Sequence, residues 1–247
     1  MLHIKSNLLK VNPTRYMPSE FHLIGKGVYT LAEAYRLTGV PSRRIVRWTQ
    51  GYDFDYRGSL RHSPPIIASA DNLVDDQPIL DFLDLIEIRF LNAFREYGVG
   101  WKAIRIAGLR ARELLQRTHP FSTRKFKTDG RTILAEFVAE TGDRVLLDLV
   151  KHQYKFRKVI DPYLYGGLDF NEYEEPSRWW PLGRNRRIVI DPKRGFGAPI
   201  IARHGIATRV ISQSYQSLQS YEAVAGWFET DTKSVYDAIE YESKLVH

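Results

Sequence analysis

The sequence predicts a mainly α-helical protein with small β elements, and three observations support this fold class. Apolar residues recur every three or four positions over several long stretches, which is the period of an amphipathic helix. Short extended runs lie between turns that contain Gly and Pro, which indicates hairpins rather than a large sheet. The length of 247 residues fits about two domains, since a domain typically holds roughly 100–200 residues.

The composition limits the class of protein and its partners. The chain carries a formal net charge of +7, which favours a polyanionic partner such as nucleic acid, an acidic protein or an anionic membrane. It contains no cysteine, which excludes disulfides, thiolate zinc sites and cysteine nucleophiles. The first residues lack the apolar run of a signal peptide, and no run of about 20 apolar residues occurs. We therefore expect a cytoplasmic protein with no membrane contact.

The first structured region is predicted to contain two short helices. Residues 1–27 form an irregular arm with several Pro and Gly residues. Thr30 then serves as an N-cap and Glu33 as its capping-box partner. Gly39 ends the first helix, and a second helix runs from Pro41–Ser42 to Gly51. The predicted buried side consists of Leu31, Ala34, Tyr35, Leu37, Val40, Ile45, Val46 and Trp48.

The remaining elements follow in order along the chain. Turn residues in 52–67 predict a small hairpin or wing. Helical periodicity covers 80–98 and 101–116. Residues 126–138 resemble a hairpin around an Asp129–Gly130 turn, a further strand is expected at 145–147 and a helix at 150–160, and 161–187 reads as a linker. The last unit is predicted to have strands at 188–190 and 199–202, then helices at 208–218, 220–229 and 231–245.

The two short helices match the pattern of a helix-turn-helix, whose second helix enters the major groove of DNA. Arg43 and Arg47 share one face of that helix, and arginine is suited to bidentate contact with guanine or phosphate. Basic residues of the wing extend this surface. The predicted DNA-binding residues are Thr30, Ser42, Arg43, Arg44, Arg47, Tyr56, Arg57, Arg61 and His62. The alternative interpretation is a solvated basic helix that binds no ligand.

The head resembles a known family. The stretch YTLAEAYRLTGVPSRRIVRW at 29–48, followed by YRGSLRHSPP at 56–65, looks like the MerR-type winged helix-turn-helix. The usual acidic-aromatic continuation after the recognition helix is missing, and the chain has no cysteines for metal sensing. The resemblance therefore implies the DNA-binding module without the metal or drug sensor.

The C-terminal end resembles the domain-of-unknown-function family numbered 433, over about 55 residues. Its landmarks are Asp191–Pro192, Gly197–Pro199, Gly205–Thr208 and the helix end at 238–242. A MerR-like head joined to this unit looks like the long VapB-type antitoxins. That resemblance implies a homodimer that represses its own operon by binding operator DNA. It also implies neutralisation of a PIN-domain ribonuclease toxin of the VapC type.

The chain is predicted to divide into four segments. They are an N-terminal arm at 1–27, the winged helix-turn-helix domain at 28–118, a β-hairpin and linker region at 119–187, and a C-terminal dimerisation or toxin-binding domain at 188–247. A stand-alone dimeric transcription regulator without a toxin is the alternative function. No cofactor and no metal are expected.

An enzyme is not expected. The chain lacks a P-loop, a Rossmann glycine pattern and a Gly-x-Ser-x-Gly motif. His119, His152, His204 and His247 read as isolated residues, and His204 as part of a turn. The acidic residues Asp71, Asp75, Asp76, Asp81 and Asp84 are consistent with a metal-dependent nuclease, but carboxylates at a helix start also favour the helix dipole. We prefer this second explanation.

Overall fold

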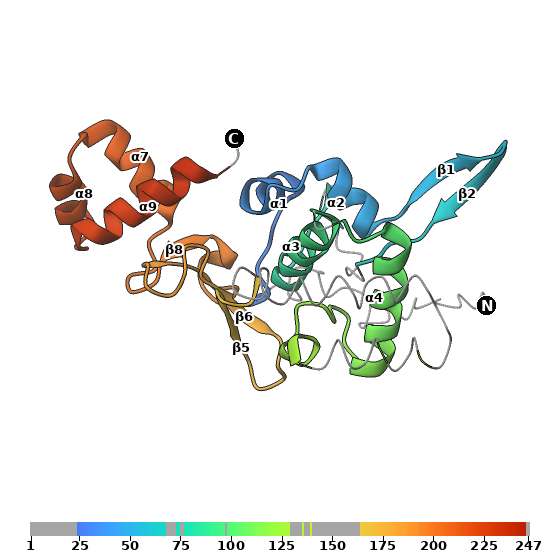
Figure 1. Cartoon of the computed structure of the whole chain (residues 1–247). Helices are drawn as coiled ribbons and strands as arrows, with labels where there is room; N and C mark the ends of the chain where they lie inside the picture. Colours follow the sequence, from blue (N-terminus) through green and yellow to red (C-terminus); the bar gives the residue numbers. More distant parts are fainter. Residues whose placement is uncertain are drawn as a thin grey trace, which may run out of the picture.

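The computed structural model of the chain describes residues 24–67, 73–74, 77–96, 98–128, 135, 139 and 164–245 (Figure 1). Helices dominate, with small antiparallel sheets, which confirms the predicted fold class. The helices are α1 (Leu31–Thr38), α2 (Ser42–Thr49), α3 (Phe82–Glu96), α4 (Trp101–Leu115), α7 (Thr208–Leu218), α8 (Tyr221–Trp227) and α9 (Thr232–Lys244). The strands are β1 (Tyr52–Tyr56), β2 (Ser59–Ser63), β3 (Leu73–Val74), β4 (Gln77–Pro78), β5 (Leu168–Phe170), β6 (Pro176–Trp179), β7 (Ile188–Ile190) and β8 (Pro199–Ile201).

Helices α1 and α2 form the predicted helix-turn-helix. Thr30 and Glu33 form a complete capping box at the start of α1, as expected. Gly39 ends α1 in the left-handed conformation with φ of 71°, which glycine adopts without steric cost. Val40, fully buried in the turn, and Ile45 on α2 join the core. The local signals in the sequence thus define both helices within a residue or two.

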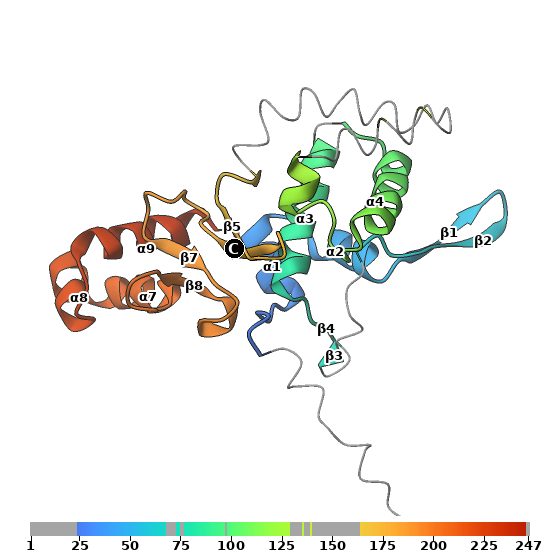
Figure 2. The same cartoon turned by 90° about the horizontal axis from the view of Figure 1, so that it is seen from below.

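The predicted wing is the hairpin of β1 and β2. The strands pair antiparallel from Tyr52 opposite Ser63 to Tyr56 opposite Ser59. The two-residue loop has positive φ at both positions, 55° for Arg57 and 76° for Gly58, as a type I′ turn requires. The hairpin projects away from the helices and stands clear of the described body of the protein (Figures 1 and 2).

Helix α3 lies at the centre of the main core. Eleven of its residues are buried, including the polar residues Asp84, Glu87 and Arg89. The guanidinium carbon of Arg89 lies 3.9 Å from the centroid of the Trp179 ring, so α3 and the sheet strand β6 pack together. The expected helices at 80–98 and 101–116 are confirmed. The amphipathic pattern of α3 predicts one buried face, whereas residues on most of its circumference are buried.

The predicted hairpin at 126–138 is wrong in its described part. Residues 124–128 are helical, with the Lys127 amide donating to the Thr123 carbonyl at 3.2 Å. Ala135, expected in a strand, is helical too. The Asp129–Gly130 turn, most of the second strand, the strand expected at 145–147 and the helix expected at 150–160 lie outside the described residues.

The expectation of a linker at 161–187 is wrong at two segments, where the structure contains strands. Strands β5 and β6 lie in it and pair with each other, and β6 pairs with β7, so the sheet has the order β5-β6-β7-β8. The Pro, Gly, Tyr and Trp content that suggested a linker is equally typical of short strands joined by tight turns. Trp179 pairs with Ile190 and is buried, which ties this stretch to the C-terminal unit.

The C-terminal unit contains β7 and β8 followed by three helices, as predicted; α7 and α9 pack on the strands, and α8 packs on α7 and α9. Helix α7 has the expected bounds, and α8 and α9 begin one residue after theirs. A second apolar core forms from Ile188, Ile201, Ile211, Val224, Val235 and their neighbours. Among the residues that the structure describes, none of the helices combines the length and apolarity needed to cross a membrane.

The C-terminal unit contacts the head directly. The Tyr29 hydroxyl donates to the Gly197 carbonyl at 2.9 Å, and the Val28 amide donates to the Phe196 carbonyl at 3.0 Å. Arg36 on α1 forms an ion pair of 2.8 Å with Glu242 on α9. In both views α8 and the wing lie at opposite ends of the molecule (Figures 1 and 2).

Candidate nucleic-acid interface

The second helix of the helix-turn-helix exposes its basic side. Ile45 and Trp48 are buried against the core, whereas Arg43, Arg44 and Arg47 lie on the outer side of α2, each at least partly exposed. One turn of helix separates Arg43 from Arg47, so their side chains leave α2 in the same direction. This separation of apolar and basic residues is what a recognition helix needs, because it is anchored on one side and open on the other.

Two of the three arginines are already positioned by neighbours. The Arg44 guanidinium donates to the Asn92 side chain on α3 at 3.1 Å. The Arg47 guanidinium carbon lies 4.9 Å from the centroid of the Tyr52 ring at the base of the wing. These contacts limit the rotamers of both side chains, so less conformational entropy is lost when they bind a ligand.

Thr30 and Ser42, which the sequence places among the DNA-binding residues, both engage the protein backbone. The Thr30 hydroxyl accepts the Glu33 amide at 3.2 Å in the capping box. The Ser42 hydroxyl donates to the Leu31 carbonyl at 3.3 Å and so links α2 to α1. Each hydroxyl therefore contributes directly to folding the motif. Their contact with DNA stays a prediction.

The wing carries a second basic group around one aromatic ring. The guanidinium carbons of Arg57 and Arg61 lie 5.4 Å and 4.7 Å from the centroid of the Tyr56 ring. Tyr56 itself is 45% exposed. Because alternate residues of a strand share a face, Tyr52, Phe54 and Tyr56 lie on the same side of the hairpin as Arg61. The structure thus brings Arg47, Tyr56, Arg57 and Arg61 to one surface.

His62 belongs to the opposite face of the wing. It pairs with Asp53 in the register, and its Nδ1 lies 2.7 Å from an oxygen of that carboxylate. Asp55 and Leu60 are on this face too. The sequence grouped His62 with Arg61 as basic residues of the wing, but neighbours in a strand point in opposite directions.

The base of the wing is fixed by contacts that sequence reasoning missed. The amides of Ile66 and Ile67 both donate to the Trp48 carbonyl, at 2.8 and 2.9 Å. Arg105 on α4 donates to the Pro64 carbonyl at 2.7 Å and to the Ser63 hydroxyl at 2.8 Å. These bonds hold the wing at a set angle to α2. Those from Arg105 join segments too far apart in sequence for a local signal.

Sequence reasoning also missed Tyr52, Phe54 and Arg95. The alternation of aromatic and acidic residues in 52–56 was the available signal for the first two. Arg95 on α3 lines a cavity of about 400 Å³ together with Arg44, Arg47 and Tyr52. The cavity lies where α2, α3, the start of α4 and the wing meet.

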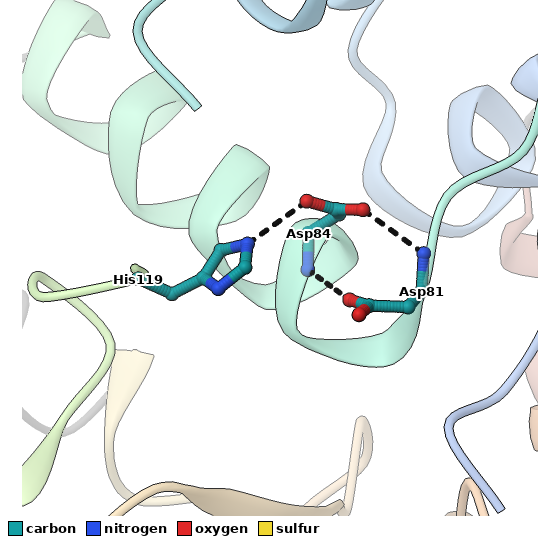
Figure 3. A group of neighbouring side chains, drawn as sticks. All are labelled: Asp81, Asp84 and His119. Carbon is teal, nitrogen blue, oxygen red and sulfur yellow. Dashed lines mark hydrogen bonds and ion pairs between the residues drawn. The ribbon is translucent and has the colours of Figure 1, made fainter. Parts of the chain in front are cut away.

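The acidic cluster has a structural explanation in its described part. The Asp81 amide donates to Asp84 at 3.0 Å and the Asp84 amide donates to Asp81 at 2.9 Å, so the pair caps α3 (Figure 3). Asp71, Asp75 and Asp76 lie outside the described residues. Reciprocal capping agrees with the interpretation of these carboxylates as helix-start residues.

The expectation that His119 is isolated is wrong. Its Nε2 lies 2.8 Å from the other oxygen of Asp84, and both side chains are buried (Figure 3). Ligand atoms of Asp81, Asp84 and His119 lie within 4.8 Å of one another, and these residue types suit a divalent cation. Both oxygens of Asp84 already accept hydrogen bonds, however, so the geometry is accounted for by capping and pairing.

Comparisons with known proteins agree with this architecture. Residues 27–108 match a family model described as "Putative DNA-binding HTH domain". The chain is 25% identical over 224 residues to "Putative antitoxin VapB45" of Mycobacterium tuberculosis, covering 86% of this chain and 92% of that protein. The crystal structure of Rv2018 from Mycobacterium tuberculosis superposes with a TM-score of 0.68 at 26% identity, over 85% of this chain and 96% of that one. The head is thus a helix-turn-helix domain, and the likeness extends through most of the chain.

Proposed function

We propose that this chain is an antitoxin that binds operator DNA through α2 and one face of the wing, and that neutralises a PIN-domain ribonuclease toxin. The observation that carries the DNA-binding half is the arginine surface that runs from α2 to the wing. Arg43 and Arg47 extend from α2, and Arg57 and Arg61 extend from the wing. Arginine contacts both base edges and phosphates, so this surface suits duplex DNA.

The two groups of arginines have different roles in this proposal. An α-helix fits the major groove of B-DNA, which places Arg43 and Arg47 next to base edges. The wing then follows the adjacent backbone, where Arg57 and Arg61 neutralise phosphates. Base contacts supply specificity, and phosphate contacts supply register and the dependence on salt.

The antitoxin half is supported by the likeness to the VapB45 antitoxin over most of both chains. It is also supported by the two sequence resemblances, of the head to MerR-type domains and of the C-terminal end to family 433. Within this proposal residues 28–118 read DNA and residues 188–247 serve dimerisation or toxin binding. A homodimer would bind two half-sites about 10 base pairs apart, or a multiple of that spacing.

A gel-shift assay tests the DNA-binding half. Purified protein is titrated on a duplex from its own promoter and on a scrambled duplex at about 150 mM salt. We expect tight binding to the promoter alone, and Arg43→Ala and Arg47→Ala each to weaken it by about 1–3 kcal/mol. Arg203→Ala is the control, since it removes the same charge from the C-terminal unit, away from α2 and the wing. Equal and weak binding to both duplexes would refute sequence-specific recognition.

A ribonuclease assay tests the antitoxin half separately. The product of an adjacent reading frame that encodes a PIN domain is purified, and its cleavage of RNA is followed with and without this chain. We expect stoichiometric inhibition and a complex that co-elutes in size-exclusion chromatography. If cleavage is unchanged and the two proteins elute separately while promoter binding persists, the chain is a stand-alone regulator.

A further inference from the structure

We propose that the concave corner between the wing and α2 also binds single-stranded nucleic acid, with unpaired bases stacked on the aromatic side chains of the wing. This site goes beyond the proposed recognition of an operator duplex and does not depend on it. It consists of an aromatic wall, formed by Tyr52, Phe54 and Tyr56, and a cationic floor, formed by Arg44, Arg47 and Arg95.

The aromatic wall follows from the register of the hairpin. Tyr52, Phe54 and Tyr56 alternate with Asp53 and Asp55 along β1, so the three rings share one face. Phe54 is 38% exposed and Tyr56 is 45% exposed, although large aromatic side chains are normally buried. The Tyr52 and Phe54 ring centroids lie 5.9 Å apart. Phe54 and Tyr56 are therefore exposed rings on a projecting ribbon, and the partly buried ring of Tyr52 continues the wall at its base.

The cationic floor adjoins this wall at Tyr52. Arg44, Arg47 and Arg95 line the cavity there, and Glu96 is the acid in its lining. Arg95 extends from α3 and donates to the Val99 carbonyl at 2.7 Å, which restrains its guanidinium. A groove with a cationic floor follows a phosphate backbone, while aromatic side chains beside it accept the bases.

Arginines also accompany the rings themselves. Arg47 packs on Tyr52, and both Arg57 and Arg61 pack on Tyr56, at cation–π distances. Each such contact restrains a ring while keeping a positive charge next to the position that a phosphate would occupy. The wall therefore carries its own neutralising charge at both ends of β1.

The rings favour a single strand over a duplex. Within a duplex each base face is covered by the next base pair, so protein rings find no base surface to stack on. Contact with duplex phosphates requires the arginines of the wing but makes no use of Phe54. The opposite face carries Asp53 and Asp55, which repel a polyanion and confine it to the aromatic side. An unpaired strand is the ligand that uses both the rings and the arginines.

Fluorescence anisotropy with labelled homopolymers tests the site. The probes are a thymidine DNA strand and a uridine RNA strand, each of about 20 nucleotides. A promoter duplex is measured in parallel at the same salt. We expect the wild-type protein to bind at least one homopolymer, and the comparison of the two shows whether the 2′-hydroxyl contributes.

Paired variants separate this site from duplex recognition. The variant Phe54→Leu keeps an apolar side chain without a ring, and we expect it to weaken homopolymer binding about tenfold with duplex binding within about threefold. Phe54→Tyr, which keeps a ring at that position, should retain wild-type affinity. Leu60→Ala, on the opposite face, is the matched control. Arg43→Ala should show the reverse pattern and weaken duplex binding alone.

Two outcomes would overturn the proposal. One is that the wild-type protein does not bind either homopolymer at about 150 mM salt. The other is that Phe54→Leu, shown by circular dichroism to be folded, binds homopolymers as tightly as the wild-type protein. Neither result bears on the operator proposal, which fails only if the promoter duplex is not bound specifically.

Discussion

At the residue scale, the most consequential side chains outside the interface are the buried ionisable groups of α3. Glu87 accepts the amides of Phe121 at 3.2 Å and Ser122 at 3.0 Å, and burial raises the pKa of its carboxyl. Burial alone would lower the pKa of His119, but the hydrogen bond to Asp84 and the nearby carboxylates outweigh it and raise the pKa above its usual value. The loop at 119–122 is thus attached to α3 by charge and hydrogen bonds.

We expect His119→Gln to lower the free energy of unfolding by about 1–3 kcal/mol, because the buried Asp84 carboxylate loses its charged partner. Chemical denaturation near pH 6 measures this loss. His204→Gln, at an exposed turn position, is the matched control and should change stability by less than about 0.5 kcal/mol. Equal losses in the two variants would contradict a special role for His119.

The raised pKa of His119 makes the stabilisation pH-dependent. Between its unfolded pKa, about 6.5, and its higher folded pKa, the folded state binds more protons than the unfolded state. The contribution of His119 is therefore complete below about pH 6.5 and is lost as pH rises through the folded pKa. Denaturation curves across pH should show the wild type and His119→Gln converging at high pH. If the difference in free energy of unfolding between the two proteins stays constant with pH, the protonation of His119 does not contribute to stability.

At the scale of elements, the junction between α2 and the wing depends on Gly51. Its φ is 79°, and a Cβ at this position would lie 2.5 Å from the Ser63 carbonyl oxygen. Glycine thus permits both the left-handed turn and the close approach of β2. Together with the hydrogen bonds at the Trp48 carbonyl, it sets the angle at which the wing leaves the helix-turn-helix.

We expect Gly51→Ala to destabilise the protein by more than the roughly 1 kcal/mol that left-handed strain alone costs, and to weaken duplex binding by misplacing the wing. Gly58→Ala is the matched control, since its φ is 76° and a Cβ there meets nothing within 4 Å. Thermal denaturation and the promoter gel shift measure both effects. If the two variants behave alike, the contact with Ser63 has no influence on the wing.

The two faces of the wing should respond differently to salt. We propose that Arg61 neutralises a phosphate, so in Arg61→Ala the slope of log affinity against log salt should fall by about one, equally for all DNA sequences. His62→Ala, next in the chain but on the opposite face, should leave the slope unchanged. Titrations at several salt concentrations test this. A similar change for both residues would mean that the two faces approach DNA together.

Elements with a local signature could be predicted from the sequence. The Thr30 cap, the Gly39 stop and the turn of the wing each depend on a few adjacent residues, and all three are found. The strands β5 and β6 were missed because their pairing with β7 depends on contacts distant in sequence. The helix at 124–128 was missed because short polar runs next to a Gly turn resemble a hairpin equally well.

The candidate site was predicted in part for the same reason. Arginines on α2 follow from helical spacing alone. The separation of His62 from Arg61, and the gathering of Tyr52 and Phe54, depend on the strand register, which the sequence does not specify by itself. The cavity with Arg95 requires α3 to pack beside α2, which is a tertiary contact.

At the scale of the whole molecule, Glu242 connects the two units. It is buried on α9, forms an ion pair with Arg36 on α1 at 2.8 Å and accepts a hydrogen bond from Thr208 on α7. Because α1 is the first helix of the helix-turn-helix, the C-terminal unit rests directly against the DNA-binding head. The same junction includes the bond from Tyr29 to Gly197.

We expect Glu242→Gln to weaken this junction by about 1–3 kcal/mol, because Arg36 loses its charged partner. In differential scanning calorimetry we expect the C-terminal unit of this variant to melt before the head, and the wild-type protein to melt in a single transition. Glu222→Gln, at an exposed position on α8, is the control. A single unshifted transition in Glu242→Gln would mean that the apolar contacts alone hold the units together.

The hairpin has a further consequence for how the chain tolerates change. Along β1 the even positions 52, 54 and 56 lie on the same face as Arg61, and the odd positions 53 and 55 lie on the opposite, acidic face. Deleting one residue within β1 would exchange the two sets and place carboxylates on the side of Arg61. A substitution in β1 changes one side chain and leaves the others on their faces. An insertion or deletion leaves the remaining side chains on their faces only if it adds or removes an even number of residues.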